Sequence, residues 1–395
     1  MAYFQSRPAS GRHFLHVPGP SNIPDRVLRA IDHPAMDHRS ADFGLLGRQV
    51  LDAVRPVFGT EGPVIIYPSS GTGAWEAALV NTLSPGDAVL MCRTGWFAVL
   101  WLEMAQKLGL EPRVIETDWR RGADVAAIAE ALAEDRGQRI KAVCVVHNET
   151  STGCASDIVA VRRAMDAAGH PALLMVDAIS SIGSMEYRHD EWRVDVTVCG
   201  SQKGMMMPPG LGFNAISVKA LEAARTARLP RSYWDWQPML ETNATGLFPY
   251  TPAINLLYGL NEAMQMLAEE GLANVFARHD RLAEATRRAM AAWGLQNQCL
   301  DPAAYSSSVT AVRLPEGHSA DAFRAAVLER FNMSLGTGLG AMKDRAFRIG
   351  HLGDLGALQL LGVLAGVEMG LRLARVPHRE GGVSAAMDFL AGGGG

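Results

Sequence analysis

Short apolar runs alternate with helical patterns through the first half of the chain, and this alternation constrains the fold more than any other feature. The runs predicted as strands are PVIIYPSS (63–70), DAVLMC (87–92), PRVIETD (112–118), KAVCVVHNE (141–149), PALLMVDAISS (171–181) and VDVTVCGSQK (194–203). Helical spacing separates the first five of them. Strands alternating with helices of this length predict an α/β fold with a mainly parallel sheet between helices.

Bulk composition excludes several classes of protein. With 395 residues, 48% of them hydrophobic and a net charge of −4, the chain can bury a large core. It has no long basic block, so we expect no nucleic-acid partner. It has no apolar run of about 18 residues and no apolar leader, so we expect neither a membrane span nor secretion. Its 5 scattered cysteines indicate a reduced cytoplasmic protein without a zinc site, and we expect no bound metal.

The second half of the chain predicts a smaller α/β unit. A long helical region covers about residues 254–295, and SVTAVRLPEG, ADAFRAAVLERF and AFRIGHLGD follow it. We therefore expect an N-terminal arm and substrate loop at residues 1–22, a large domain at 23–272 and a small C-terminal domain at 273–395.

Function is expected where strands end, because ligands of open α/β sheets bind at the carboxyl ends of the strands. After VIIYP comes Ser69-Ser70-Gly71-Thr72-Gly73, which opens a helix. Hydroxyl and glycine residues at a helix N-terminus can bind an anion such as phosphate. An ordinary helix cap is the alternative explanation for these residues. A second polar cluster, at residues 148–153, follows the run KAVCVVH, and a capped turn is the alternative explanation for it.

Asp177 and Lys203 end two successive apolar runs. A carboxylate in such a position is costly unless it meets a cation or hydrogen-bond donors. A partly desolvated lysine loses proton affinity and becomes nucleophilic. A helix cap or metal ligand at Asp177 and a surface loop at Lys203 are the simpler alternatives. Together with the upstream anion site, the pair matches the needs of pyridoxal phosphate, which requires a lysine, a carboxylate and a phosphate site.

The sequence resembles the class V, fold-type I pyridoxal-phosphate aminotransferases, in the branch that uses glyoxylate. The resemblance spans about residues 14–370. The stretches that carry it include HVPGPSNIP, DHRSADF, SSGTGAWEAALVNTLSPGD, VVHNETSTG, HPALLMVDAISSIGSM, GSQKGMMMPPGLG, FPYTPAINLLYGL and FRIGHLGDL. It implies a large domain with a seven-stranded sheet and a smaller C-terminal domain. It also implies the cofactor pyridoxal 5'-phosphate.

The resemblance implies a role for individual residues. Lys203 would hold the cofactor as a Schiff base, and Asp177 would pair with its ring nitrogen. Arg348 would bind the substrate carboxylate, beside the loop that contains Pro18 and Gly19. The other residues implied to contact the cofactor are Ser70, Gly71, Thr72 and Gln202 at the phosphate, Phe97 on the ring, Thr150 at the phenolic oxygen, and Tyr250 and Thr251 reaching the phosphate of a partner subunit.

The implied reaction moves the amino group of L-serine to glyoxylate, giving hydroxypyruvate and glycine by ping-pong chemistry. Alanine, aspartate or ureidoglycine are alternative donors that would use the same residues. The implied assembly is a homodimer with shared active sites, or a tetramer. A cysteine desulfurase would need a reactive cysteine on a loop near Arg348, where the sequence has none. A non-enzymatic regulator would require the loss of Lys203, Asp177 or Arg348, and all three are present.

Overall fold

The computed structural model describes residues 12–392, and its largest sheet has seven strands in the order β2-β10-β9-β8-β5-β3-β4. These strands are β2 (Val64–Ser69), β3 (Ala88–Arg93), β4 (Glu111–Glu116), β5 (Ile140–Val146), β8 (Leu173–Asp177), β9 (Val196–Gly200) and β10 (Gly210–Ile216). Only β10 runs antiparallel to its neighbours. The predicted mainly parallel seven-stranded sheet is confirmed.

The seventh strand, β10, is the one that the apolar pattern did not reveal. It follows β9 after a short loop, Ser201–Pro209, instead of a crossover helix, so it returns antiparallel beside β9. Its sequence GLGFNAI contains two glycines and an asparagine, which weaken the strand signal. The loop between β9 and β10 contains Lys203.

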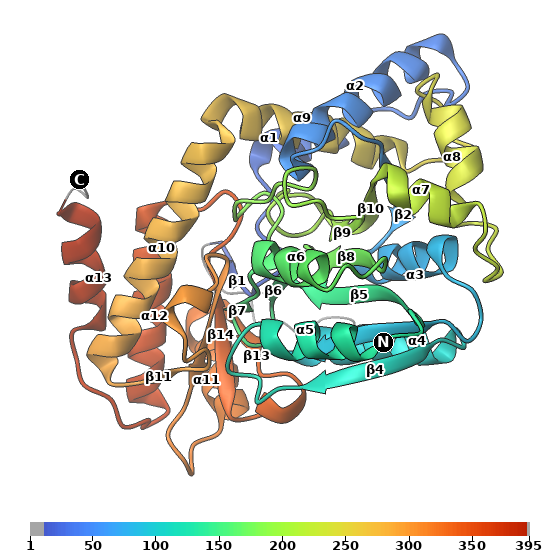
Figure 1. The fold of residues 1–395 in the computed structure, drawn as a ribbon. Coiled ribbons are helices and arrows are strands. Elements are labelled where there is room, and N and C mark those ends of the chain that lie inside the picture. The colour runs from blue at the N-terminus through green and yellow to red at the C-terminus, as the bar shows by residue number, and fades with distance from the viewer. Residues whose placement is uncertain (1–11, 393–395) are drawn as a thin grey trace, which may run out of the picture.

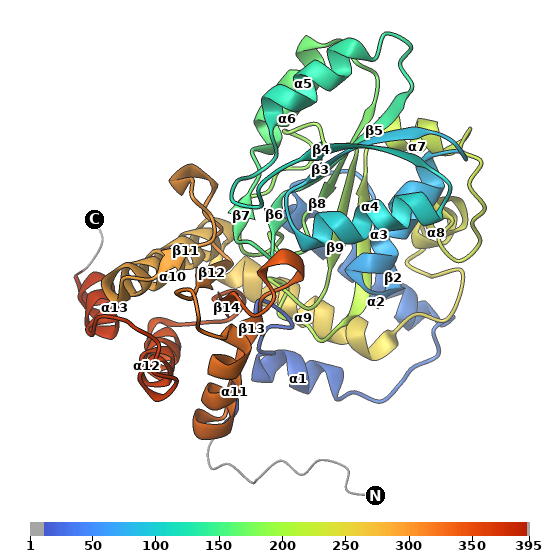
Figure 2. The same cartoon turned by 90° about the horizontal axis from the view of Figure 1, so that it is seen from below.

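Helices cover both faces of this sheet, with α3 and α4 on one side and α5 and α6 on the other (Figure 2). The helices of this part are α1 (Asp25–Ile31), α2 (Ala41–Phe58), α3 (Gly71–Thr82), α4 (Trp96–Lys107), α5 (Val125–Glu134), α6 (Ile158–Ala167), α7 (Val218–Ala224), α8 (Trp236–Asn243) and α9 (Ile254–Glu270). Strands β2, β3, β5, β8 and β9 are almost wholly buried, as expected where both faces are covered, whereas the edge strand β4 is partly exposed.

A second, five-stranded sheet has the order β1-β13-β14-β12-β11. Its strands are β1 (Phe14–His16), β11 (Gln296–Asn297), β12 (Val309–Arg313), β13 (Met333–Thr337) and β14 (Ala346–Gly350), and its helices are α10 (Leu272–Trp293), α11 (Ala320–Phe331), α12 (Ala357–Leu373) and α13 (Gly382–Ala391). Strand β1 comes from the predicted N-terminal arm and pairs with β13, in parallel. The arm's residues 1–11 lie outside the described part of the chain.

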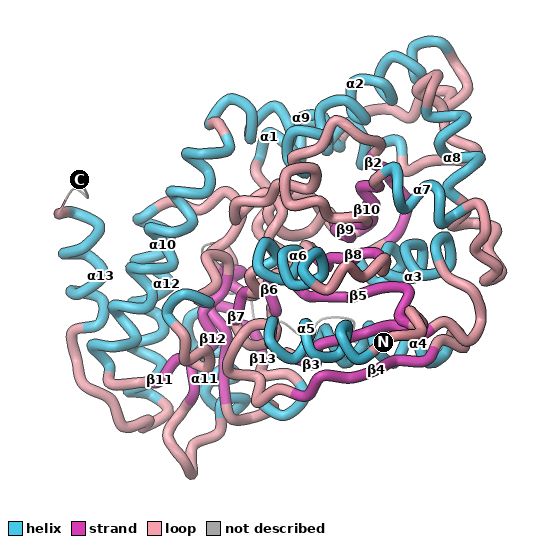
Figure 3. Tube along the Cα trace, in the orientation of Figure 1, coloured by secondary structure: helices cyan, strands magenta, loops and turns pink. Residues whose placement is uncertain are grey.

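The two sheets are joined by α9 and α10, which run end to end from one part to the other (Figures 1 and 3). Gly271 separates these helices at φ +81°, a conformation that glycine adopts without steric cost. Each part has its own hydrophobic core. Between residues 12 and 392, none of the helices has the length and apolar character needed to cross a bilayer.

Candidate active site

Four chain segments leave the large sheet at the same edge and bring the predicted site residues together. Strands β2, β5, β8 and β9 run in one direction, so the residues that follow them meet. Ser70 follows β2, Glu149 follows β5, Asp177 ends β8, and Lys203 follows β9. The pairing of Asp177 with both Val146 and Val198 fixes its carboxylate at this edge.

Lys203 is buried, with 8% of its surface exposed. Its Nζ donates to the carbonyl oxygen of Pro18 at 2.7 Å. Ser21 ties the two segments together, because its backbone N–H donates to Gln202 and its hydroxyl donates to the carbonyl oxygen of Lys203. Burial, followed by the nearby charge of Arg348, lowers the pKa of Lys203 to about 8. An amine of this kind is available as a base and nucleophile near neutral pH.

Gly19 lies against the Lys203 side chain in a conformation that requires glycine. Its φ is +108°, and a Cβ at this position would stand 2.4 Å from Nζ and 2.3 Å from Cδ of Lys203. The loop that contains Pro18 and Gly19 therefore closes directly over the lysine.

Asp177 is a buried carboxylate that receives hydrogen bonds but no cation. Trp75 Nε1 donates to Oδ2 at 3.0 Å and the backbone N–H of Ile179 donates to Oδ1 at 2.8 Å. Among residues 12–392 it forms no ion pair. Burial raises its pKa from 3.8 to about 7. The carboxylate is thus held ready for a positively charged or N–H-bearing partner.

The N-terminus of α3 forms a cradle that side chains would fill. Ser70 caps this helix. At Gly71 a Cβ would lie 2.3 Å from Ile179 Cδ1, and at Gly200 it would lie 3.2 Å from the Gly71 backbone nitrogen. Nearby, Oε1 of Gln202 is buried without a hydrogen-bond partner in the described structure. Free amide groups at a helix N-terminus favour a phosphate at this place, and Thr72 is exposed beside it.

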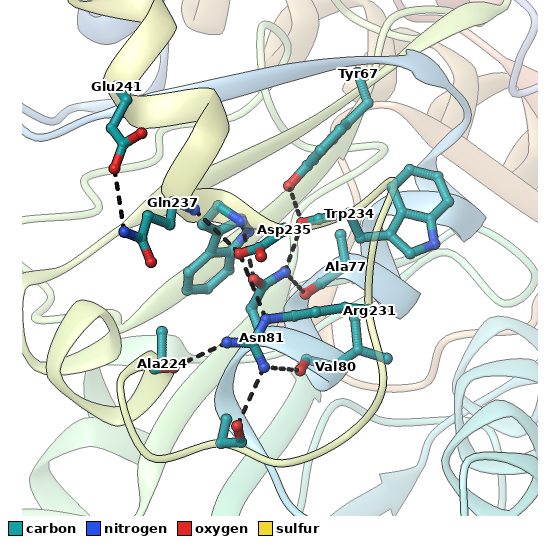
Figure 4. Close-up of polar contacts among 12 residues, drawn as sticks. Tyr67, Ala77, Val80, Asn81, Ala224, Arg231, Trp234, Asp235, Gln237 and Glu241 are labelled. Atoms are coloured by element: carbon teal, nitrogen blue, oxygen red, sulfur yellow. Dashed lines mark hydrogen bonds and ion pairs between the residues drawn. The ribbon is translucent and has the colours of Figure 1, made fainter. Parts of the chain in front are cut away.

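Helix α3 is fixed in place by the segment that precedes α8 (Figure 4). The side chain of Asn81, near the end of α3, donates to the carbonyl oxygen of Trp234 at 2.7 Å and accepts from the backbone N–H of Trp236 at 3.0 Å. The hydroxyl of Tyr67 donates to the carbonyl oxygen of Trp234 in the same segment. Arg231 donates to the carbonyl oxygens of Val80 in α3 and Ala224 in α7. At the other end of α3, Trp234 packs so closely that a Cβ on Gly73 would lie 2.7 Å from its ring.

Arg348 reaches the site from β14 of the second sheet. Its Nη1 donates to the carbonyl oxygen of Thr150 at 2.9 Å, and its Nε donates to that of Thr337 at 2.8 Å. It is 6% exposed, and burial lowers its pKa to about 10, with the nearby Glu149 charge acting in the opposite direction. A pinned, buried guanidinium of this kind is suited to binding a carboxylate.

Glu149 is the site residue whose importance the sequence did not reveal. It is fully buried. Its carboxylate accepts from the backbone N–H groups of Phe97 and Ala98 at the start of α4, and from the backbone N–H and hydroxyl of Ser151. A Cβ on Gly95 would lie 2.3 Å from Glu149 Cγ. One carboxylate therefore positions both the start of α4 and the loop whose Thr150 binds Arg348. The stretch HNETSTG contains it, but only the fold reveals which helix its carboxylate faces.

The comparison with known families agrees with this geometry. A family model described as aminotransferase class-V matches residues 13–342. The chain belongs to this family. Class-V aminotransferases depend on pyridoxal 5'-phosphate, and their substrates are amino acids and 2-oxo acids. The predicted family, fold and enzyme class are therefore confirmed.

Individual relatives of this class-V aminotransferase use glyoxylate, according to their names. The chain is 52% identical to a serine–glyoxylate aminotransferase of Methylorubrum extorquens, over 96% of both chains. It is 47% identical to an L-aspartate–glyoxylate aminotransferase of Paracoccus denitrificans, over 95% of both. A crystal structure of the ureidoglycine–glyoxylate aminotransferase of Bacillus subtilis superposes with a TM-score of 0.89 and 26% identity, covering 98% of this chain and 100% of that one.

Two further predicted residues lie around the class-V aminotransferase site. Thr150 is buried, and its hydroxyl donates to Ser180 Oγ at 2.6 Å. Phe97 is partly buried in the first turn of α4. Its neighbour Trp96 packs instead against Gly340, in the connection between β13 and β14. A Cβ on Gly340 would lie 2.7 Å from the Trp96 ring. The two adjacent aromatic residues therefore face different surroundings.

Tyr250 of the class-V aminotransferase lies beside the segment that precedes α8, and Thr251 follows it in the chain. Tyr250 stacks on Tyr233 with ring centroids 4.4 Å apart, and Thr251 is exposed. In the described part of the chain, no hydrogen bond joins either residue to Lys203 or Asp177. Nor does residue range 12–392 contain a group of three or more His, Cys, Asp or Glu side chains that could hold a metal ion.

Proposed function

We propose that this class-V aminotransferase transfers the amino group of L-serine to glyoxylate, giving hydroxypyruvate and glycine. The observation that carries the proposal is the 52% identity over 96% of the chain to a serine–glyoxylate aminotransferase. Two further relatives with this name are each 46% identical over 95% or more of the chain. The buried lysine, carboxylate and arginine are the groups that such a reaction requires.

The residues at the sheet edge fit pyridoxal 5'-phosphate. The carboxylate of Asp177 has no cation partner among the described residues, and Gln202 has an unused oxygen. Gly71 at the start of α3 and Gly200 at the end of β9 lack side chains that would crowd the amide groups there. We propose that the following residues hold the cofactor: Lys203 at the reactive carbon, Asp177 at the ring nitrogen, Phe97 on the ring, Thr150 at the phenolic oxygen, and Ser70, Gly71, Thr72 and Gln202 at the phosphate. When bound, the cofactor withdraws electrons from the substrate Cα.

Lys203 is the acid and base of the proposed reaction. Its lowered pKa, about 8 in the ligand-free chain, leaves part of the amine neutral near neutral pH. The neutral Nζ accepts the proton from the substrate Cα and later returns a proton to the product. With the cofactor bound, the Asp177 carboxylate would pair with the ring nitrogen, and this would support proton loss at Cα.

Arg348 sets the orientation of the substrate. Two of its N–H groups are used by the carbonyl oxygens of Thr150 and Thr337, and the remaining donors of the guanidinium can bind the substrate carboxylate. The loop with Pro18 and Gly19 closes the opposite side over Lys203. Both serine and glyoxylate have a carboxylate beside the reacting carbon, so one arginine serves both substrates.

Other amino donors are the alternative. The aspartate-specific relative is 47% identical, close to the identity of the serine-specific relatives, and alanine and ureidoglycine donors occur among similar proteins by name. Discrimination between small donors of this kind amounts to about 1–3 kcal/mol. The test is kcat/KM for L-serine, L-alanine, L-aspartate and (S)-ureidoglycine, each with glyoxylate as acceptor and glycine as the product measured. The proposal requires L-serine to have the highest value, and a higher value for another donor rejects it.

We also propose that the enzyme is a cytoplasmic homodimer with shared active sites, with a tetramer of such dimers as the alternative. Thr251 is exposed and Tyr250 is only partly buried against Tyr233, so both are available to a partner's phosphate site. The five cysteines are buried free thiols, which is consistent with a reducing compartment.

A further inference from the structure

A cavity of about 540 Å³ lies between the two sheets, away from Lys203. We name it the arginine cleft; its lining includes Arg120, Arg313 and Arg345 together with Trp96 and Trp119. Arg120 comes from the large domain, just after β4, whereas Arg313 ends β12 and Arg345 directly precedes β14 in the small domain. Neither Lys203, Asp177 nor Arg348 lines it.

Three guanidinium groups of the arginine cleft are not paired with carboxylates in the described part of the chain. Arg120 donates to the backbone carbonyls of Asn297 and Gln298, and Arg313 donates to the Gln298 side chain. Within residues 12–392, Arg120, Arg313 and Arg345 form no ion pair. Burial, and then the charges of Arg120 and Arg345, lower the pKa of Arg313. Arg313 is therefore close enough to Arg120 and to Arg345 to be repelled by the charge of each.

One carboxylate does line the cleft. Asp118 accepts a hydrogen bond from the backbone N–H of Arg120 at 2.9 Å, not from a guanidinium. Arg93, also in the lining, is paired with Glu116. The unpaired positive charges of the cleft are therefore those of Arg120, Arg313 and Arg345, which come from both domains.

The walls of the cleft are held in a definite shape. Trp119 has φ +60°, an unusual backbone conformation for a tryptophan. Its carbonyl oxygen accepts from Gln298 Nε2 at 2.8 Å, which ties it to the small domain. The rings of Trp96 and Trp119 both meet Gly340, where a Cβ would stand 2.7 and 2.8 Å from them. A preformed wall of this kind reduces the entropy cost of binding a ligand.

The location also favours a ligand. The cleft opens where β3 and β4 end, at the carboxyl edge of the sheet. Guanidinium groups bind phosphate and carboxylate groups through paired hydrogen bonds. A ligand with several negative charges would remove the repulsion between the arginines and connect the two domains.

We propose that the arginine cleft is a binding site for a small polyanion, such as a phosphorylated or polycarboxylate molecule, that Arg120, Arg313 and Arg345 hold between the domains. The site is independent of the proposed amino donor, since it shares no lining residue with the Lys203 cluster. Binding there stabilises the folded enzyme by mass action.

The test uses the cofactor-loaded enzyme and two probes, pyrophosphate and citrate, each compared with sodium chloride of equal ionic strength. We expect at least one probe to raise Tm and to bind in titration calorimetry, and the stronger probe distinguishes phosphate from carboxylate chemistry. Arg345→Gln is the informative variant, because Arg345 is exposed and donates no side-chain hydrogen bond in the described structure. It should weaken probe binding about tenfold.

The matched control is Arg163→Gln, an exposed arginine on α6 outside the cleft, which should bind the probe like the unaltered enzyme. Without a probe and at low salt, Arg345→Gln should raise Tm, because it relieves the repulsion on Arg313. The proposal is overturned if neither probe binds beyond the chloride effect. It is equally overturned if Arg345→Gln binds the probe as well as Arg163→Gln does, because the anion is then bound elsewhere.

Discussion

The Nζ atom of Lys203 lies 2.7 Å from the carbonyl oxygen of Pro18, so the loop before the first helix contacts the proposed catalytic lysine. Gly19 continues this contact and leaves no room for a side chain. The N-terminal loop is therefore part of the proposed site, although Pro18 lies 185 residues from the lysine in sequence.

Gly19→Ala should impair catalysis by displacing Lys203. The new methyl group would stand 2.3 Å from Lys203 Cδ, at a backbone conformation that disfavours alanine. We expect a loss of about 1–3 kcal/mol of stability together with a large loss of kcat, measured by thermal unfolding and steady-state kinetics. Gly86→Ala is the control, because Gly86 also has a positive φ, +81°, but no other atom lies within 4 Å of the place where its Cβ would stand. Equal kinetics in the two variants would contradict the displacement of Lys203.

Glu149→Gln should lower kcat/KM without unfolding the enzyme. The carboxylate orders Phe97 and the Thr150 loop through four hydrogen bonds, and a neutral amide cannot accept all of them. Loss of one charge-assisted bond corresponds to about 1.5–3 kcal/mol, so we expect a decrease of about tenfold or more and a changed absorbance of the bound cofactor. Asp124→Asn, which alters the N-cap of the remote α5, should change neither quantity. A Glu149→Gln enzyme with unchanged kinetics and absorbance would show that Glu149 only caps α4.

Asp177 predicts a pH dependence of stability in the cofactor-free protein. Its pKa is raised from 3.8 to about 7, so the folded chain binds more protons than the unfolded chain between these values. The contribution of Asp177 to the free energy of unfolding is therefore present at low pH and is lost as the pH rises from about 4 to 7. The measurement is the difference in denaturant stability between the unaltered protein and Asp177→Asn at each pH. A difference that stays constant over this range would contradict the raised pKa.

Arg348→Lys should raise KM for both substrates more than it lowers stability. Lysine keeps the charge but loses the planar donors that bind a carboxylate and the carbonyl oxygens of Thr150 and Thr337 together. We expect KM for serine and glyoxylate to rise by about tenfold or more. A rise for only one substrate would mean that the two carboxylates bind at different places.

The proposed shared site predicts complementation between inactive subunits. A Lys203→Ala subunit and a subunit with both Tyr250→Phe and Thr251→Ala should regain activity when mixed, because one site of the heterodimer then has an intact lysine and an intact loop. Recovery is measured after co-refolding, with each variant alone as the control. Heterodimers that form without any recovered activity would indicate that Tyr250 and Thr251 serve only packing.

Much of the sheet could be predicted because a short apolar run marks each of β2, β3, β4, β5, β8 and β9, and polar residues follow several of these runs. Asp177 and Lys203 were found in this way, and the fold brings them to one edge. Strand β10 was missed because its glycines and asparagine hide the apolar pattern. The pairing of β1 with β13 joins residues more than 300 positions apart, and no local pattern encodes such a contact.

The site was less predictable than the sheet, because its contacts join segments that lie far apart in the sequence. The direction of the Glu149 carboxylate depends on where α4 begins, and the space for it depends on Gly95, which lies 54 residues earlier by number. The closeness of Gly19 to Lys203 depends on the path of the N-terminal arm. Such contacts between distant segments are set by tertiary packing and not by spacing in the sequence.

Isotope tracing tests most directly whether the enzyme transfers the amino group of serine to glyoxylate. Purified enzyme is given cofactor, L-serine labelled with ¹⁵N and unlabelled glyoxylate, and glycine and hydroxypyruvate are quantified by mass spectrometry. We expect labelled glycine and hydroxypyruvate to form in equal amounts, and Lys203→Ala to form neither above the enzyme-free background. Unlabelled glycine, or no glycine at all from an enzyme with bound cofactor, would contradict it.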